Sequence, residues 1–157
     1  MRQCGAVDKT APPEREVDVL RRGVAELVAR LPAGWRANVA EQLMGGSGGG
    51  RADALVDLIA SDGSRAVLVL EPKRSVAVRD LAAIVHRLEV AIGRLSGSAP
   101  ELVPVVVARY LTPSVRSWLD DHDVSYVDAT GNMRILAHTP ALYLRDRGAD
   151  RDPWPPQ

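Results

Sequence analysis

The sequence predicts an α/β domain in which helices flank a mixed β-sheet. Apolar residues recur at helical spacing over 14–31 and again over 78–95, so each segment is expected to form an amphipathic helix. Residues 52–60 instead alternate between apolar and polar side chains, which is the two-residue period of a strand. Thr112 and Pro113 are typical of the N-cap and first position of a further helix, between two apolar segments. Helices that alternate with strands predict helical layers packed on a sheet.

The expected elements follow the order α-β-β-β-α-β-α-β, and a β-rich segment comes after them. The helix between the strands at 102–110 and 124–128 implies a parallel, right-handed crossover. The loop GGSGGG and the turn signal SDGS allow the first three strands to pair as a meander. Pro104 lacks a backbone N–H, so it is expected near the beginning of its strand or at a sheet edge. The expected strands cover 35–43, 52–60, 65–73, 102–110, 124–128, 133–136 and 141–146.

The length and composition are those of one ordinary domain. The chain has 157 residues, of which 46% are hydrophobic, and it contains no Phe, so the core must consist mostly of aliphatic side chains. We expect a disordered N-terminus over 1–13, one domain over 14–150 and a proline-rich tail without regular structure over 151–157. The loop GGSGGG does not divide the chain, because the residues before it are too few for a separate core.

The charge and the cysteine content exclude several classes of protein. Twenty basic and twenty acidic residues cancel, so a nucleic acid would have to be bound by a local patch of positive charge. The single cysteine, Cys4, cannot form an internal disulfide, and the sequence shows no zinc-ligand spacing. The apolar runs are too short to span a bilayer, and the first residues lack the apolar core of a signal peptide. These features predict a soluble, cytoplasmic protein.

An acid and a base follow the apolar run of residues 67–70. Glu71 and Lys73 are two positions apart on a predicted strand, so their side chains share a face. A carboxylate can hold Mg²⁺ through oxygen, and a nearby ammonium can orient a water or offset negative charge on a phosphate. One carboxylate makes a poor magnesium site, but the expected neighbouring strand carries Asp53 and Asp57, and paired strands lie about 4.8 Å apart.

The register of this hairpin decides whether the three acids meet. With a two-residue turn, both aspartates point to the face opposite Glu71. With a three-residue loop, Glu71 lies opposite Leu55, between Asp53 and Asp57 on its own face. A slip of one residue moves every side chain of a strand to the other face. A metal site therefore requires an odd loop or a bulge within 61–65, and a tight two-residue hairpin would exclude it.

An acid near the start of one strand, a turn, and an apolar strand that ends in E-x-K resemble the PD-(D/E)xK, or restriction-endonuclease-like, superfamily of nucleases. In that family a helix precedes a three-stranded meander, and a helix and further strands follow. The element order here is the same over roughly residues 14–136. Ala52 departs from the family pattern, because a proline usually stands before the first acid. The resemblance implies a restriction-endonuclease-like mixed sheet flanked by helices.

The resemblance also implies roles for individual residues. In the family the acids bind Mg²⁺, and the lysine assists attack of water on a phosphodiester. By position, Asp53 and Glu71 would bind Mg²⁺ or Mn²⁺, and Lys73 would position or activate the water. Asp57 is the alternative to Asp53 as the first acid.

A second stretch, PVVVARYLTPSVRSWLDDHDVSYVDATGNMRI over 104–135, resembles bacterial restriction-endonuclease-like regulators, including antitoxins related to the abortive-infection AbiEi type. Proteins of this kind often continue beyond a DPW-like segment into a winged-helix DNA-binding domain. Here the sequence stops at Gln157, which leaves a truncated and a short, stand-alone form as alternatives.

Three functions follow, and the first two are of different class. The first is Mg²⁺-dependent hydrolysis of phosphodiester bonds in DNA, in a defence or mobile-element context. Arg74 and Arg79 would contact phosphates, and Arg87, on the same helix as Arg79, is a further candidate. The alternative is a non-catalytic DNA-binding regulator or antitoxin-like module on the same fold, which the neutral net charge favours. A third is a subunit of a larger defence complex. The implied partners are DNA, a second copy in a homodimer, and a protein of a defence or toxin–antitoxin locus.

Simpler interpretations stand beside these roles. Glu71 and Lys73 are also what a solvated strand end would contain. Asp128, Gly131 and Asn132 are typical of a turn, in which glycine supplies positive φ and a short polar side chain caps the loop. A surface position is expected for His86, on the polar face of its helix, and His122 and His138 have no recognisable partner.

Overall fold

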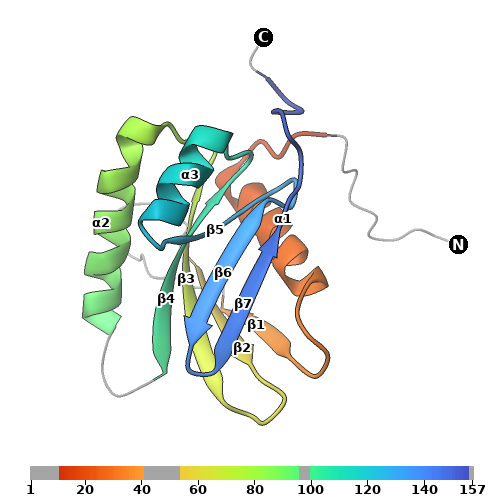
Figure 1. Ribbon diagram of the computed structural model, residues 1–157, viewed down its shortest axis with the longest axis vertical. Helices are drawn as coiled ribbons and strands as arrows, with labels where there is room; N and C mark the ends of the chain where they lie inside the picture. Colours follow the sequence, from red (N-terminus) through yellow and green to blue (C-terminus); the bar gives the residue numbers. More distant parts are fainter. Residues whose placement is uncertain (1–10, 41–53, 96–99, 156–157) are drawn as a thin grey trace, which may run out of the picture.

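The computed structural model describes residues 11–40, 54–95 and 100–155. Within them the chain forms a seven-stranded sheet whose strands neighbour one another in sequence order, and three helices (Figure 1). The helices are α1 (Glu16–Ala29), α2 (Val78–Leu95) and α3 (Pro113–Asp121). The strands are β1 (Arg36–Ala40), β2 (Ala54–Ile59), β3 (Arg65–Lys73), β4 (Glu101–Ala108), β5 (Ser125–Asp128), β6 (Met133–His138) and β7 (Ala141–Asp146).

The sheet is mixed, as the sequence predicts. The strands β1, β2 and β3 form an antiparallel meander. The central strands β3, β4 and β5 are parallel, and α2 and α3 connect them. The strands β6 and β7 complete the sheet in antiparallel orientation. The predicted order α-β-β-β-α-β-α-β is therefore confirmed, and the β-rich segment after it forms β6 and β7.

Helices cover both faces of the sheet. α1 packs on one face, where Leu27 belongs to a core cluster with Leu68 and Leu70 of β3. α2 and α3 pack on the other, where Leu88 and Val69 belong to a second cluster. Figure 1 shows α2 and α3 together on one side and α1 apart from them. Because helices cover both faces around β3, that strand is a continuous apolar run instead of an alternating one.

The burial of β2 differs from that of β3. Its residues alternate between buried and partly exposed positions, which confirms the predicted period of two. The even-numbered residues, such as Val56 and Leu58, face the α1 cluster. The odd-numbered residues face the other side of the sheet, where α2 covers β3 and β4 more completely than β2. The strand can therefore carry a charged residue such as Asp57.

The β2–β3 hairpin has a three-residue loop. Ala60 donates its backbone N–H to the carbonyl of Ser64 at 2.8 Å, which leaves 61–63 as the loop. Gly63 has a φ of 89°, a conformation that glycine adopts without strain. The loop has an odd number of residues, as a metal site requires. The three-residue loop considered above would cover 62–64, so the observed loop lies one position earlier. Leu55 therefore lies opposite Val69 instead of Glu71.

The prediction for the start of α3 is confirmed, whereas Pro104 lies within an inner strand, at a level where that strand is paired on one side. Thr112 caps α3 by accepting a hydrogen bond from the N–H of Val115 at 3.3 Å, and Pro113 is the first helical residue. Pro104 lies in the first half of β4, before Val105, where the pairing with β5 begins. At that level β4 has a hydrogen-bonded neighbour only on its β3 side. The missing N–H of Pro104 therefore interrupts no bond between β4 and β5.

The described part of the predicted tail, residues 151–155, has no helix or strand, but it contacts the domain. Arg109, directly after β4, donates to the carbonyl oxygen of Trp154 at 3.3 Å. The guanidinium of Arg22 on α1 lies 5.6 Å from the centre of the Trp154 ring. Figure 1 shows this segment beside the N-terminal end of α1. The tail is thus held by side chains from two elements that are distant in sequence.

The approach of α1 to the sheet depends on Gly23. A Cβ at this position would lie 2.7 Å from Cγ1 of Val107, a fully buried residue of β4. We expect Gly23→Ala to lower the free energy of unfolding by about 1–2 kcal/mol, because the steric cost exceeds the gain in helix propensity. The matched control is Gly93→Ala on α2, where a Cβ meets no described atom within 4 Å, and which should gain up to about 1 kcal/mol. Urea unfolding of both variants measures the difference, and equal stabilities would contradict the close approach.

Candidate functional site

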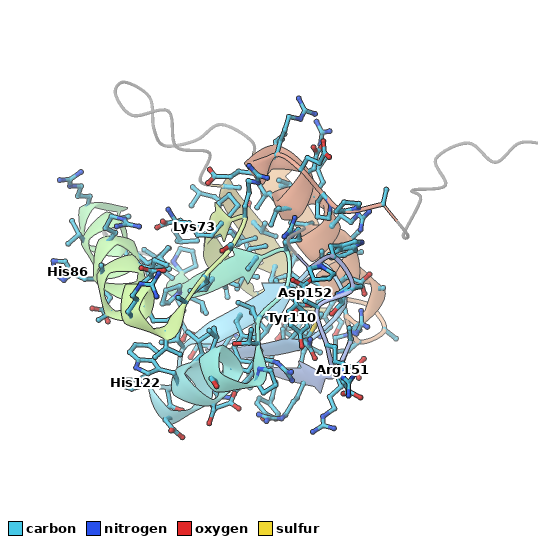
Figure 2. The ribbon with its side chains drawn as sticks, turned by 90° about the horizontal axis from the view of Figure 1, so that it is seen from above. Lys73, His86, Tyr110, His122, Arg151 and Asp152 are labelled. Atoms are coloured by element: carbon cyan, nitrogen blue, oxygen red, sulfur yellow. The ribbon has the colours of Figure 1, made fainter. Side chains whose placement is uncertain are left out.

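The predicted site residues lie where the parallel strands end. β3, β4 and β5 point their carboxyl ends to the same edge of the sheet, and Glu71 and Lys73 are near the end of β3. Ligands of open α/β sheets typically bind at this edge. Figure 2 looks onto it from above and shows Lys73 between α2 and α1. The location therefore agrees with a binding or catalytic role.

Glu71 is buried and ion-paired. The residue is 3% exposed, and it lies beside Val106 in the pairing of β3 with β4. Its Oε2 atom is 3.1 Å from Nζ of Lys73 and 3.1 Å from Nη2 of Arg87 on α2. The side chains of Lys73 and Arg87 are 25% and 39% exposed, so both cations reach solvent, whereas the carboxylate that they contact is buried. Glu71 is thus not a solvated strand end.

The two cations make this burial possible. An ionised carboxylate that leaves water loses several kcal/mol of hydration free energy unless opposite charges and hydrogen bonds replace the water. Lys73 and Arg87 provide two positive charges for one negative charge, so the three side chains carry a net charge of +1. Hydrogen bonds between charged partners are stronger than those between neutral ones. The arrangement is a small, cationic patch with a buried acid below it.

Arg87 is the site residue whose role the sequence does not reveal. Helical spacing places it among the surface arginines of α2, and only the packing of α2 on β3 brings it to Glu71. A weak signal exists, because Arg87 lies next to Leu88 and one turn after Ile84, which are both buried. A long side chain that flanks the buried stripe of a helix can reach the sheet below.

The two candidate partners of Glu71 have different outcomes. Asp53 lies outside the described residues. Asp57 pairs with Val67, four residues before Glu71 along β3, which corresponds to about 13 Å at 3.3 Å per residue. Its carboxylate is 3.6 Å from the guanidinium of Arg65. The structure therefore does not bring Asp57 to Glu71.

Within the ranges that the structure describes, no three His, Cys, Asp or Glu side chains gather as a metal site. Glu71 supplies one hard oxygen ligand of the kind that Mg²⁺ accepts, and Mg²⁺ in proteins often has only one or two carboxylate ligands besides water and substrate phosphate. Two positive charges already lie at Oε2 of Glu71, which is the charge that a divalent cation would bring. The donor chemistry fits such a cation, provided that it replaces a side-chain cation.

The predicted phosphate contacts lie at the same edge. Arg74 follows the last residue of β3, and Arg79 is in the first turn of α2. Both side chains are exposed, and neither forms an ion pair with another described residue. With Lys73 at the end of β3 and Arg87 in the middle of α2, they make four cationic side chains on β3, on α2 and on the segment between them. A local basic patch therefore exists in a chain of zero net charge.

The second motif, around Asp128, is structural. Asp128 is fully buried, and its carboxylate accepts hydrogen bonds from the backbone N–H groups of Leu111, Thr130 and Asn132 at 2.8–3.1 Å. The side chains of Thr130 and Asn132 donate to it as well. Gly131 has a φ of 104°, which confirms the predicted turn. The motif joins the start of α3 to the β5–β6 turn, and its Asp128 and Asn132 side chains are buried.

The three histidines are exposed, as predicted for His86, but His122 and His138, for which the sequence shows no partner, have partners in the structure. His122 stacks on Trp118 of α3, with ring centres 3.7 Å apart. His138 lies 3.2 Å from the carboxylate of Glu101. Figure 2 shows His86 and His122 pointing away from Lys73. These side chains do not contribute to the Glu71 site.

Comparison with known proteins provides little beyond this geometry. The chain matches no protein-family model, and no curated protein is similar to it in sequence. A solved structure similar to the chain is that of EndoMS in apo form, with a TM-score of 0.39 and 17% sequence identity. The alignment covers 75% of this chain and 47% of the EndoMS chain, so this chain spans less than half of the length of EndoMS. At this level the similarity does not extend to an activity.

In the described part of the chain, no helix is long and apolar enough to cross a membrane.

The role of Asp128 predicts a large effect on stability. In Asp128→Asn, an amide would replace a carboxylate that accepts five hydrogen bonds, and its NH₂ group would face N–H donors in a buried site. We expect a loss of about 3 kcal/mol or more in the free energy of unfolding. The control Asp121→Asn changes an exposed aspartate of α3 and should alter stability by less than about 0.5 kcal/mol. Thermal and urea unfolding test this, and a stable Asp128→Asn variant would contradict the anchoring role.

Proposed function

We propose that the chain is a nuclease-like domain of the PD-(D/E)xK type, which hydrolyses phosphodiester bonds in DNA with Mg²⁺ or Mn²⁺. The observation that supports it is the buried Glu71 carboxylate, joined to Lys73 at the carboxyl edge of three parallel strands. A buried acid with cationic partners at such an edge is typical of functional sites.

In this proposal Glu71 is a ligand of the metal ion, and Asp53 supplies the second carboxylate. Lys73 positions the attacking water or offsets the negative charge that develops on the phosphate. When bound, Mg²⁺ would polarise the phosphate as a Lewis acid. Arg74 and Arg79 bind neighbouring phosphates of the DNA backbone through their exposed guanidinium groups.

The register of the β2–β3 hairpin supports Asp53 over Asp57. The odd loop places the odd-numbered residues of β2 on the face of Glu71, as the hypothesis requires. The described pair of residues nearest to the site is Ala54 with Leu70. Their neighbours in the sequence on the side of the site are Asp53 and Glu71. Asp57 lies four residue pairs from the level of Glu71 and has Arg65 as its partner. The homodimer and the protein partner of a defence or toxin–antitoxin locus stay predictions.

The proposal is tested by titrating Mg²⁺ and Mn²⁺ into the wild type and Glu71→Ala by calorimetry, together with a plasmid-nicking assay. We expect metal binding and nicking in the wild type and neither in Glu71→Ala. Lys73→Ala should bind metal but nick at least about 100-fold more slowly, because it lacks the charge that assists the reaction.

Asp57→Ala is the matched control, since it removes an acid from the same hairpin that lies away from Glu71. It should bind metal and nick like the wild type. Nicking that survives in Glu71→Ala, or that Lys73→Ala leaves unchanged, would exclude this site as the origin of the activity. Circular dichroism establishes that each variant is folded.

The second candidate is a domain that binds nucleic acid without metal and without catalysis. The observation that favours it is the occupation of Oε2 of Glu71 by two side-chain cations, beside the exposed Arg74 and Arg79. Glu71 would then only hold Lys73 and Arg87 in place, and the basic patch would contact phosphates. Fold alone does not distinguish the two functions.

This candidate predicts DNA binding in the presence of EDTA. The double variant Arg74→Ala/Arg79→Ala should weaken binding and reduce the slope of log K against log salt by about 2, because each phosphate contact contributes about 0.9. Arg36→Ala/Arg94→Ala is the control, because these exposed arginines lie at the start of β1 and the end of α2, away from the patch. Fluorescence anisotropy measures the binding, and equal salt slopes for both double variants would contradict the assignment of the patch.

A further inference from the structure

We propose that Arg87 is a positioning residue that competes with a divalent metal ion for the carboxylate of Glu71. In the absence of metal, its guanidinium holds Oε2 of Glu71, and metal binding releases it to the surface of the basic patch. This inference rests on the proposed metal-binding role of Glu71. It goes further in making Arg87 the link between metal binding and DNA binding.

Both side-chain cations contact the same oxygen atom. Nζ of Lys73 and Nη2 of Arg87 are each 3.1 Å from Oε2 of Glu71. A divalent cation coordinated by this oxygen would lie among two further positive charges at close range, which is unfavourable in a partly buried site. At least one of the two side chains must therefore move when a metal ion binds.

Arg87 is the one better placed to move. Lys73 is on β3, two residues from Glu71 on the same face, so the backbone keeps the two side chains close. Arg87 comes from α2, through a long side chain that is 39% exposed. Withdrawal of its guanidinium toward solvent requires rotation of the side chain only and leaves the strand unchanged.

The contact of Arg87 is also poorly satisfied. Its Nε atom is buried and has no hydrogen-bond partner among the described residues. Its contact with Glu71 uses one nitrogen, whereas arginine favours bidentate contacts with a carboxylate. A buried donor without a partner destabilises the arrangement that contains it. Release of Arg87 would expose this donor to water or to a phosphate oxygen, which partly offsets the loss of the contact.

Released from Glu71, Arg87 would add a free positive charge beside Arg74 and Arg79. Metal binding would then strengthen the binding of DNA, and DNA would strengthen the binding of metal by the same factor, because such coupling is reciprocal. Without Arg87, the metal ion would no longer have a competitor from α2, and part of the coupling would be lost.

The test is Mn²⁺ binding without DNA, measured by calorimetry on the wild type, Arg87→Met and the control Arg94→Met. Methionine keeps much of the length of the side chain and removes the charge. We expect Arg87→Met to bind Mn²⁺ about tenfold more tightly than the wild type, which corresponds to about 1.4 kcal/mol. Arg94→Met removes a charge from the same helix two turns away and should bind like the wild type. Arg87→Lys should stay within about threefold of the wild type, because it keeps the competing charge.

Unchanged or weaker Mn²⁺ binding by a folded Arg87→Met variant would overturn the inference, and so would the absence of Mn²⁺ binding in every variant. If Arg87→Met does not fold, Arg87→Gln removes the charge but keeps a hydrogen-bond donor, and it replaces Arg87→Met in the comparison. As a second readout, Mn²⁺ should raise the affinity for DNA more in the wild type than in Arg87→Met, and equal increases would also count against competition.

The outcomes separate this inference from the proposed function. Tighter Mn²⁺ binding by Arg87→Met that Glu71→Gln abolishes, without any nicking of DNA, would support the competition and reject hydrolysis. Metal-dependent nicking that requires Glu71, with equal Mn²⁺ affinities in the wild type and Arg87→Met, would support hydrolysis and reject the competition.

Discussion

The central position of β3 imposes the constraint on which the candidate site depends. β3 has a neighbouring strand on each side, and helices cover both faces of the sheet around it. The side chains of residues 66–72 on this strand leave water whether or not they are apolar, and Glu71 is 3% exposed for this reason. A buried carboxylate requires positive charge or hydrogen bonds close by. The pairing with Lys73 and Arg87 is therefore a consequence of the fold as much as a feature of a site.

Two buried acids of this chain meet the same requirement in different ways. Asp128 is surrounded by backbone N–H groups and neutral side chains, which cannot leave without unfolding the turn that they belong to. Glu71 is held by the ends of two long, charged side chains that reach solvent. Partners of the second kind can be exchanged for an external cation or can bind an external anion. This difference makes Asp128 an anchor of the fold and Glu71 the better candidate for a functional residue.

The local patterns of the sequence predicted the elements well, because the interactions behind them are local. The start of α3 follows from Thr112 and Pro113, and the buried alternation of β2 follows from a strand with one face on the α1 core. The register of the hairpin was less accessible. The sequence SDGS allows several turns, and the observed loop of 61–63 is selected by tertiary packing together with the positive φ of Gly63. That choice separates Asp57 from Glu71, because every residue pair along a strand adds about 3.3 Å.

The sequence by itself determined that Glu71 and Lys73 share a face, because the period of a strand is set by its backbone. It also determined the order of helices and strands, since amphipathic spacing and helix caps depend on neighbouring residues. Only the tertiary structure decided that Glu71 is buried, that Arg87 is its second cation and that the segment after β7 contacts α1 and the residue that follows β4. These contacts join residues that are 16 or more positions apart, and they follow from how α1 and α2 pack on the sheet, which no local pattern encodes.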